Sequence, residues 1–234
     1  MPDTAAPQRN FYGRRKGKGL KRSHERYLAE DLPRLKVPGA DPAGNPARAP
    51  TDPAALFGDA RPLWLEIGFG AGEHLAHQAR ANPGIGFIGA EPFINGVATL
   101  LGKLRAGDPG NVRVHAGDVR DLFDVLPEGC IDRAFLLYPD PWPKARHHRR
   151  RFVTPEHLGP LARVMRPGAE LRLATDIADY VRQALEEVPA AGFALRTTDP
   201  ADWHTPWPDW HRTRYEAKAL REGRVPHYLI FARA

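Results

Sequence analysis

Short apolar runs alternate with amphipathic stretches from residue 63 to the end of the chain. The apolar runs at 63–67, 86–90, 112–115, 131–137 and 170–174 have the length and composition of buried strands. Helical periodicity follows them near 73–81, 95–105, 119–126, 155–165 and 177–187. Strands that alternate with helices predict an α/β fold with a doubly wound, mostly parallel sheet. Two late runs, 193–197 and 228–232, predict a C-terminal antiparallel pair, connected by the basic and Trp-rich segment 203–224.

The chain before residue 63 lacks this alternation and divides by composition. Residues 1–8 are expected to be disordered, and 9–19 form a basic, glycine-broken arm with two adjacent aromatic residues. A short helix is expected over 21–36, ending before Pro38. Residues 38–62 are rich in Pro, Ala, Gly and Asp, which indicates a flexible linker or a surface insertion. We therefore expect an arm and short helix at 1–37, a linker or insertion at 38–62, and a main domain at 63–234.

A glycine-rich turn follows the first predicted strand and reads Glu-Ile-Gly-Phe-Gly-Ala-Gly at 66–72. Glycines such as Gly68 and Gly70 let a backbone turn tightly and approach a ligand closely. The dinucleotide fingerprint places a third glycine where this chain has Glu73. The acid Glu66 suits a ligand ammonium group better than a pyrophosphate. The turn resembles the first motif of the S-adenosylmethionine-dependent methyltransferases.

Two more acids end the next two strands. Glu91 lies a little over 20 residues beyond the glycines, where a carboxylate can accept hydrogen bonds from both ribose hydroxyls. Asp118 follows the third strand, a position that resembles the methyltransferase residue bound to the adenine amino group. Singly, each acid could instead cap a helix or occupy a solvated turn. Together with Glu66 they are expected at one carboxyl edge of the sheet.

The fourth strand leads into Pro-Asp-Pro-Trp-Pro-Lys at 139–144 and then into a run of cations. This order places the carboxylate of Asp140 beside the indole of Trp142 at the sheet edge, directly before a basic cluster. Alternatively, Asp140 is a turn acid that bonds its own backbone between two prolines. Downstream, Asp176 could cap the helix expected near 177. Three tryptophans of the connection could stack on bases or pack internally: Trp203, Trp207 and Trp210.

The net charge of +6 is concentrated in two blocks. Residues 9–22 contain seven Lys or Arg and residues 144–151 contain five, with no acid in either block. Without these twelve positive charges the chain would carry a net charge of −6. Cations accompanied by aromatic rings are typical of a nucleic-acid binder with two contact zones. The alternative is a solvated basic tail plus a charged loop.

Taken together, these motifs resemble the bacterial tRNA (guanine-N7)-methyltransferase family, which modifies guanine 46 of the tRNA variable loop. The matching elements are Phe-Tyr-Gly-Arg-Arg-Lys-Gly-Lys at 11–18, Glu-Ile-Gly-Phe-Gly at 66–70, Gly-Ala-Glu at 89–91, Pro-Asp-Pro-Trp-Pro-Lys at 139–144, Ala-Thr-Asp at 174–176 and Thr-Arg-Tyr-Glu at 213–216. They span residues 9 to 234 apart from the Pro-rich stretch 38–62, which is longer than the family pattern requires. The resemblance implies a Rossmann-like methyltransferase sheet and S-adenosylmethionine as cofactor.

It also implies roles for individual residues. Asp140 would be the catalytic residue. The cofactor site would comprise Glu66, Gly68, Gly70, Glu91, Asp118 and Asp140. The target guanosine would be held by Lys144, Asp176, Thr213, Arg214, Tyr215 and Glu216. The tRNA backbone would be bound by Arg146, Arg149, Arg150 and Arg151, with Arg14, Arg15, Lys16 and Lys18 of the arm.

These residue types suit methylation at guanine N7. The N7 atom has an in-plane lone pair and no proton to lose, so the nucleophile needs no strong base. Catalysis then depends on in-line positioning and on stabilising positive charge that moves from sulfur to the purine. Asp140 is therefore expected to orient the base and offset charge, with Asp176 or Glu216 sharing this work. Carboxylates at the Watson–Crick edge would discriminate against adenine.

Other features limit the class of protein. A single cysteine, Cys130, excludes an internal disulfide framework and is expected in the core. Neither a signal sequence nor a membrane span is evident, so a cytoplasmic location is expected. His147 and His148 lack the spaced partners of a metal site, and none is predicted. The oligomeric state, monomer or homodimer, stays open.

Three alternatives compete with this interpretation. A nicotinamide-dependent oxidoreductase would explain the strand–glycine–acid unit but neither the missing third glycine nor the basic blocks. A non-catalytic RNA-binding module on a methyltransferase-like fold would share the basic blocks but would have a damaged cofactor pocket. A methyltransferase for another RNA or a free nucleoside is a third possibility, and the basic blocks oppose a free nucleoside.

Overall fold

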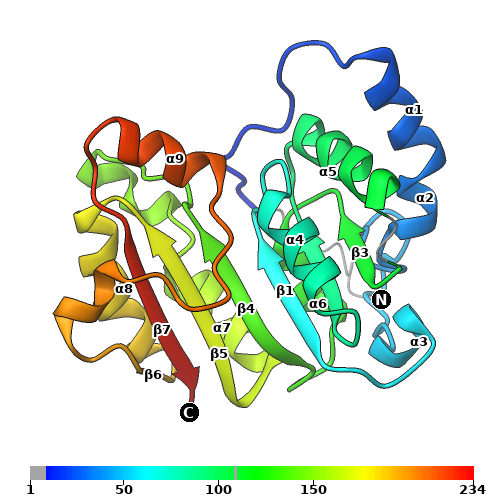
Figure 1. The fold of residues 1–234 in the computed structure, drawn as a ribbon. Helices are drawn as coiled ribbons and strands as arrows, with labels where there is room; N and C mark the ends of the chain where they lie inside the picture. The colour runs from blue at the N-terminus through cyan, green and yellow to red at the C-terminus, as the bar shows by residue number, and fades with distance from the viewer. Residues whose placement is uncertain (1–8, 108–109) are drawn as a thin grey trace.

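The computed structural model describes residues 9–107 and 110–234, which form a seven-stranded sheet with helices on both faces (Figure 1). Residues 1–8, expected to be disordered, lie outside the described part. The strands are β1 Leu63–Ile67, β2 Gly86–Ala90, β3 Val112–His115, β4 Ile131–Leu137, β5 Met165–Thr175, β6 Phe193–Leu195 and β7 His227–Arg233, in the order β3-β2-β1-β4-β5-β7-β6. Strands β1 to β5 are parallel, and β7 runs antiparallel to both β5 and β6.

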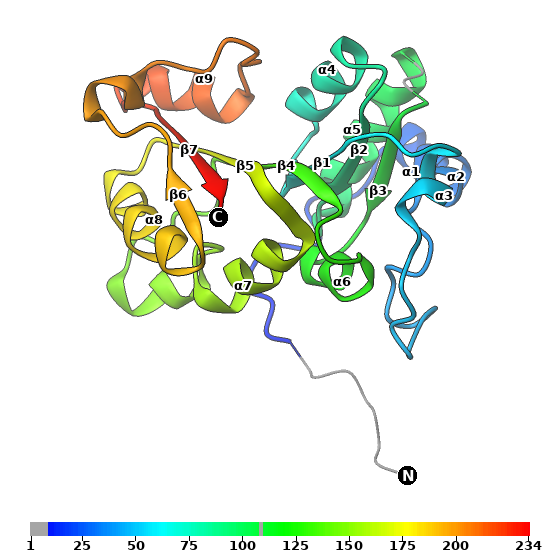
Figure 2. The same ribbon diagram turned by 90° about the horizontal axis from the view of Figure 1, so that it is seen from below.

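The helices divide between the two faces, as the view along the sheet shows (Figure 2). They are α1 Arg22–Glu30, α2 Leu32–Leu35, α3 Pro53–Phe57, α4 Glu73–Ala81, α5 Ile94–Gly107, α6 Val119–Val125, α7 Pro155–Val164, α8 Ala178–Ala190 and α9 Arg214–Arg221, with 3-10 turns at Ala145–Arg150 and Pro200–His204. One core packs α6, α7 and α8 against the sheet, and another packs α4 and α5 against the opposite face.

Strand β1 shows how the pattern positions the site. Leu63, Leu65 and Ile67 point into the core beneath α6 and α7, because alternate side chains of a strand face opposite sides. Glu66 consequently faces α4. Because parallel strands end at the same edge, the chain leaving β1, β2, β3 and β4 converges at their carboxyl ends, where ligands bind in such sheets.

The predicted elements correspond closely to those observed. The predicted α/β class and the antiparallel C-terminal strand are confirmed. The single helix expected over 21–36 is two helices, because α1 ends at Glu30 and α2 begins at Leu32. Helix α9, whose N-cap is Thr213, lies inside the segment expected only as a connection.

Residues 38–62 lie on the surface of the main domain near α6. The Thr51 N–H donates to Val125 O at 2.8 Å, and the Arg48 guanidinium approaches Asp124 at 3.4 Å. Leu56 of α3 is buried against the core. These contacts describe a surface segment attached to the domain at several points. In the described residues no helix is long and apolar enough to cross a membrane.

Candidate active site

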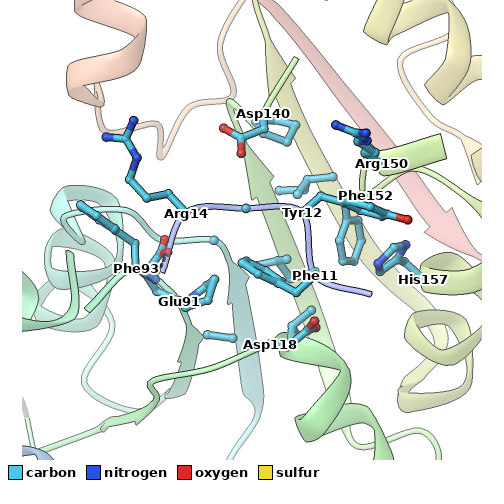
Figure 3. Close-up of a pocket in the computed structure, with 18 of the residues that line it drawn as sticks. Phe11, Tyr12, Arg14, Glu91, Phe93, Asp118, Asp140, Arg150, Phe152 and His157 are labelled. Atoms are coloured by element: carbon cyan, nitrogen blue, oxygen red, sulfur yellow. Dashed lines mark hydrogen bonds between the residues drawn. The ribbon is translucent and has the colours of Figure 1, made fainter. Parts of the chain in front are cut away.

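A cavity of about 610 Å³ opens at the carboxyl ends of β1, β2 and β4 (Figure 3). This volume lies within the range of about 300–1,000 Å³ typical of small-molecule sites. Its lining includes six of the predicted site residues, namely Gly68, Gly70, Glu91, Asp118, Asp140 and Tyr215, and two from the basic blocks, Arg14 and Arg150. Three of the four predicted acids therefore meet around one space.

The glycine turn forms the floor of this cavity. Gly68 and Gly70 have φ angles of 68° and 59°, a left-handed conformation that side chains rarely adopt. The turn is also packed closely from outside, because a Cβ on Gly96 of α5 would lie 2.2 Å from Gly70 O. The backbone is thus fixed and bare of side chains where a ligand could approach it.

Glu91 holds this turn in place. Its Oε2 accepts from Gly70 N–H at 2.7 Å, and its Oε1 accepts from Phe93 N–H at 2.8 Å. Burial raises the pKa of Glu91, and the negative charges of Asp140 and Glu66 raise it further, although the two N–H groups oppose this. Each oxygen accepts only one hydrogen bond, so both can still accept from a ligand hydroxyl.

Asp118 has the opposite electrostatic environment. It caps α6 by accepting from Arg120 N–H at 3.0 Å, and it pairs with the Arg120 guanidinium at 2.6 Å. Burial would raise its pKa, but these hydrogen bonds and the adjacent positive charge outweigh burial, and the pKa of Asp118 is lowered. Asp118 therefore both caps α6 and lines the cavity.

Glu66 is not brought into the cavity. Its side chain is buried on the opposite side of β1, where Oε2 lies 2.7 Å from His74 Nδ1 on α4. We expected Glu66 to line the pocket, but side chains alternate between the two faces of β1, and Glu66 lies on the face toward α4. Its charge still reaches the site, because it contributes to the raised pKa of Glu91.

Asp140 lies across the cavity from Glu91 and Asp118 (Figure 3). It is exposed, and no hydrogen bond to its carboxylate is found among the described residues. The alternative of a turn acid bonded to its own backbone is therefore not what the structure contains. The loop that presents it has left-handed residues on both sides, Tyr138 with φ 49° and Trp142 with φ 39°.

The N-terminal arm crosses the mouth of the cavity, a placement that the sequence did not predict. Figure 3 shows Phe11 between Asp118 and Glu91, and Tyr12 directed toward Arg150. Contacts at both ends anchor the arm. Arg9 pairs with Asp124 at 2.7 and 2.8 Å, and Arg120 donates to Asn10 O at 2.8 Å. Further along, Ile94 N–H donates to Arg15 O at 3.1 Å, and Asn95 contacts the backbone of residues 17 and 18 at 2.9 Å. The arm therefore forms one wall of the cavity.

The Thr-Arg-Tyr-Glu motif reaches the cavity through Tyr215 alone. Thr213 caps α9, and Arg214 pairs with Glu73 at 3.0 Å. Glu216 is buried, where it accepts from Trp210 Nε1 at 2.8 Å and from Tyr228 OH at 2.7 Å.

Asp176 and Glu216 do not converge with Asp140. Asp176 pairs with Arg224, and the N-cap of α8 is Ile177, so the alternative in which Asp176 caps this helix is not what the structure contains. Both carboxylates have partners within the protein, and neither is among the residues that line the cavity. The tryptophans of the same segment pack internally: Trp207 is buried, and Trp203 and Trp210 are partly buried against the cores.

The basic run at 144–151 divides into exposed and internal cations. Lys144, Arg146 and Arg149 are exposed. Arg150 lies between two aromatic rings, 5.0 Å from the centroids of both Tyr12 and Trp142, and so joins the arm to the Asp140 loop. Arg151 is buried, with no exposed side-chain surface. The expectation that Arg151 contacts a nucleic-acid backbone is corrected by this burial.

Several cavity residues were not among the predicted ones: Phe11, Tyr12, Arg120, Tyr138, Phe152 and His157. The paired aromatics at 11 and 12 carried a signal, because they stood in a basic arm, but nothing in the sequence placed that arm here. Arg120 is recognisable only as the partner of Asp118. In the part of the chain described, no group of three or more His, Cys, Asp or Glu side chains is arranged to hold a metal ion.

The residues present suit S-adenosylmethionine. A bare glycine turn, a carboxylate with free lone pairs at Glu91 and an acid at Asp118 surround one cavity of adequate size. Those residues could hold the nucleoside part, and Asp140 stands on the opposite wall.

Comparison with known proteins gives consistent matches. A family model described as a putative methyltransferase matches residues 60–229. The tRNA (guanine-N(7)-)-methyltransferase of Ruegeria pomeroyi is 69% identical over 227 residues, covering 97% of this chain and 95% of the relative. The protein of the same name from Roseobacter denitrificans is 64% identical and covers 100% of both chains. The one from Rhodospirillum rubrum is 47% identical, covering 100% of this chain and 91% of the relative.

Two solved methyltransferase structures share the fold at low sequence identity. The 16S rRNA methyltransferase KamB has a TM-score of 0.55 at 18% identity, covering 77% of this chain and 91% of that chain. A 16S rRNA (adenine(1408)-N(1))-methyltransferase from Catenulisporales acidiphilia, solved with its cosubstrate SAM, has a TM-score of 0.52 at 18% identity, covering 77% and 89%. These likenesses concern the fold, and they confirm the predicted Rossmann-like methyltransferase sheet.

Proposed function

The chain belongs to the tRNA (guanine-N(7)-)-methyltransferase family, and on this premise we propose that it transfers a methyl group from S-adenosylmethionine to N7 of guanine 46 in the tRNA variable loop. The observation that carries this proposal is the convergence of Glu91, Asp118 and Asp140 on one cavity. Exposed cations of two distant segments flank that cavity.

The cofactor is placed by the strand ends. Glu91 accepts from the ribose hydroxyls with the lone pairs that Gly70 and Phe93 leave free. Asp118, kept ionised by Arg120, accepts from the adenine amino group. The sulfonium of the bound cofactor supplies an already activated methyl group. Glu66 contributes its charge from behind β1 rather than a contact.

Asp140 acts as an orienting and electrostatic residue. Because guanine N7 carries a lone pair and no proton, Asp140 has no proton to abstract. Its carboxylate accepts from guanine N–H groups and offsets the positive charge that develops on the purine during transfer. Asp140 lies on the wall opposite Glu91 and Asp118, so the target base would lie between Asp140 and the bound cofactor.

The tRNA is bound by the exposed cations. Arg146 and Arg149 of the loop and Arg14, Arg15, Lys16 and Lys18 of the arm are available for phosphates. Tyr215 lines the cavity, Lys144 follows the loop that carries Asp140, and these two residues hold the target nucleoside. Arg214 and Thr213 position Tyr215 through Glu73 and the α9 cap. We place the protein in the cytoplasm, where tRNA is found.

The proposal is tested by transfer of labelled methyl from S-adenosylmethionine to unmodified bulk tRNA, followed by nuclease digestion and identification of the nucleoside. The expected product is 7-methylguanosine. A different methylated nucleoside would preserve the cofactor and remove the substrate assignment. Binding of tRNA without any transfer would favour a non-catalytic RNA-binding module, and binding of NAD in place of S-adenosylmethionine would favour an oxidoreductase.

A further inference from the structure

The loop that carries Asp140 has few polar interactions of its own. Residues 139–143 read Pro-Asp-Pro-Trp-Pro, so three of the five have no backbone N–H to donate. The entrance is fixed by Tyr138 N–H, which donates to Ala174 O at 2.7 Å, and the exit by Lys144 O, which accepts from His147 N–H at 2.7 Å. Between these two points, no backbone–backbone hydrogen bond reaches 139–143 in the described chain.

The backbone of this loop is also strained. Tyr138 and Trp142 adopt left-handed conformations that bulky residues disfavour. Such conformations persist only where the surroundings impose them. With so few backbone hydrogen bonds, the constraint on the five residues must come from side chains.

Arg151 supplies that constraint. Its Nε donates to Pro141 O at 2.9 Å, and this is the one hydrogen bond to residues 139–143 found in the described part of the chain. The carbonyl belongs to the residue directly after Asp140. On the outer side of the loop, Arg150 packs on the Trp142 ring at 5.0 Å and adds a contact without a hydrogen bond.

Helix α8 holds the Arg151 guanidinium rigidly. Its Nη2 donates to Asp179 Oδ2 at 2.8 Å, its Nη1 donates to Gln183 Oε1 at 2.9 Å, and the group lies 5.2 Å from the Tyr180 ring centroid. Gln183 is itself fixed by donating to Val153 O at 2.7 Å. A buried planar guanidinium with partners on two sides makes a stiff bridge from α8 to the loop.

We propose that Arg151 is a positioning residue for Asp140, and that it transmits the rigidity of α8 to the carboxylate that faces the cofactor. It does not bind tRNA, unlike the exposed cations beside it in sequence. This inference rests on the proposed function, because the exact position of Asp140 affects the rate only if Asp140 takes part in methyl transfer. Small displacements of a reacting group can reduce a rate about 10²-fold without weakening binding.

The test compares Arg151→Lys and Arg151→Met with Arg149→Gln, a matched comparison variant that removes an exposed cation two residues away. For each variant, kcat is measured at saturating tRNA and S-adenosylmethionine, and the dissociation constant of tRNA is measured at several salt concentrations. Wild-type protein is measured in parallel. If the wild type transfers no methyl group, the proposed function is wrong, whatever the variants show.

Both Arg151 variants are expected to lower kcat by about 10- to 100-fold while the tRNA affinity and its salt slope stay at wild-type values. Arg149→Gln is expected to weaken tRNA binding and to flatten the salt slope by about the value of one phosphate, an effect that the Arg151 variants should lack. If Arg151→Met does not fold, Arg151→Lys keeps the buried charge but cannot reproduce the planar fork, and it carries the test. Wild-type kcat in folded Arg151→Lys, or a reduced salt slope in either Arg151 variant, would overturn the proposal.

Discussion

Two carboxylates of the same cavity differ in their proton affinity because their neighbours differ. Glu91 is buried and accepts from backbone N–H groups, and burial raises its pKa above the ordinary value of 4.5. Asp118 is also shielded, but the Arg120 guanidinium outweighs burial and lowers its pKa below 3.8. On acidification, Glu91 therefore takes up a proton at a higher pH than Asp118 does.

This difference predicts the pH dependence of cofactor binding. Because Glu91 is protonated at a higher pH than an ordinary glutamate, the affinity for S-adenosylmethionine should fall on acidification with a midpoint above 4.5. Calorimetric titration from about pH 8 down to the ordinary glutamate range measures it. Glu91→Gln should bind more weakly and show a flat profile, and Asp118→Asn should retain the wild-type slope. A slope that survives in Glu91→Gln would assign the titration to another group.

Asp140 should contribute to turnover rather than to tRNA affinity. We expect Asp140→Ala to lower kcat by about 10²-fold or more, since it removes a group aimed at developing charge. The tRNA dissociation constant, measured by filter binding, should change less than twofold because the cations that bind phosphates remain. Asp59→Ala, which removes an exposed carboxylate outside the cavity, serves as the control. Near-normal turnover in Asp140→Ala would remove Asp140 from the mechanism.

At the scale of elements, the chain specifies its sheet clearly and its connections poorly. The strands β1 to β4 coincide with the predicted runs, because buried parallel strands must be apolar on both faces. Helix α9 escaped prediction because it lacks an apolar buried face: its buried residues are Glu216 and Ala219, while Tyr215 and Leu220 are exposed.

The same reasoning explains which site residues could be predicted. Acids at strand ends were predictable because the fold brings those ends together. Arg151 was predicted to bind the tRNA backbone because it lies in a basic run. Its burial depends on contacts with α8, which follows later in the chain. The position of the arm over the cavity likewise depends on contacts with Asp124 and Asn95, more than 70 residues away.

Asn95 should anchor the end of the arm that follows Arg14 and Arg15. Asn95 accepts from Gly17 N–H and donates to Lys18 O, both at 2.9 Å, and the neighbouring Ile94 N–H donates to Arg15 O at 3.1 Å. Asn95→Ala removes two of these three contacts and should loosen the segment around Arg14 and Arg15. Limited trypsin digestion, followed by mass spectrometry, should show cleavage there several-fold faster than in wild type. Asn45→Ala removes comparable hydrogen bonds from residues 38–62 and should leave this rate unchanged. Equal cleavage rates in all three proteins would contradict the anchoring role.

At the scale of the whole molecule, the charge is arranged around the cavity. The arm and the loop at 144–150 are far apart in sequence, and Arg150 joins them by packing on Tyr12 and Trp142. The remaining chain carries a net negative charge. We therefore expect phosphates to bind on the side of the molecule on which the cavity opens.

This arrangement predicts additive salt effects. Neutralising Arg146 and Arg149 together should weaken tRNA binding and reduce the slope of log affinity against log salt by about 0.7 to 0.9 for each phosphate that is no longer bound. The same two changes made in a variant without the arm should reduce the remaining slope by a similar amount. Electrophoretic mobility shifts at about 50 to 200 mM salt measure it, and an unchanged slope would place the phosphates elsewhere.

The most direct measurement is nucleotide-resolution mapping of the methyl group. A tRNA transcript with guanine at position 46 is incubated with protein and S-adenosylmethionine, reduced with borohydride and cleaved with aniline, which breaks the chain at 7-methylguanosine. We predict a single cleavage at position 46, which is abolished when that guanine is replaced by adenine and strongly reduced with Asp140→Ala. Cleavage elsewhere, or persistence of cleavage after the replacement, would contradict it.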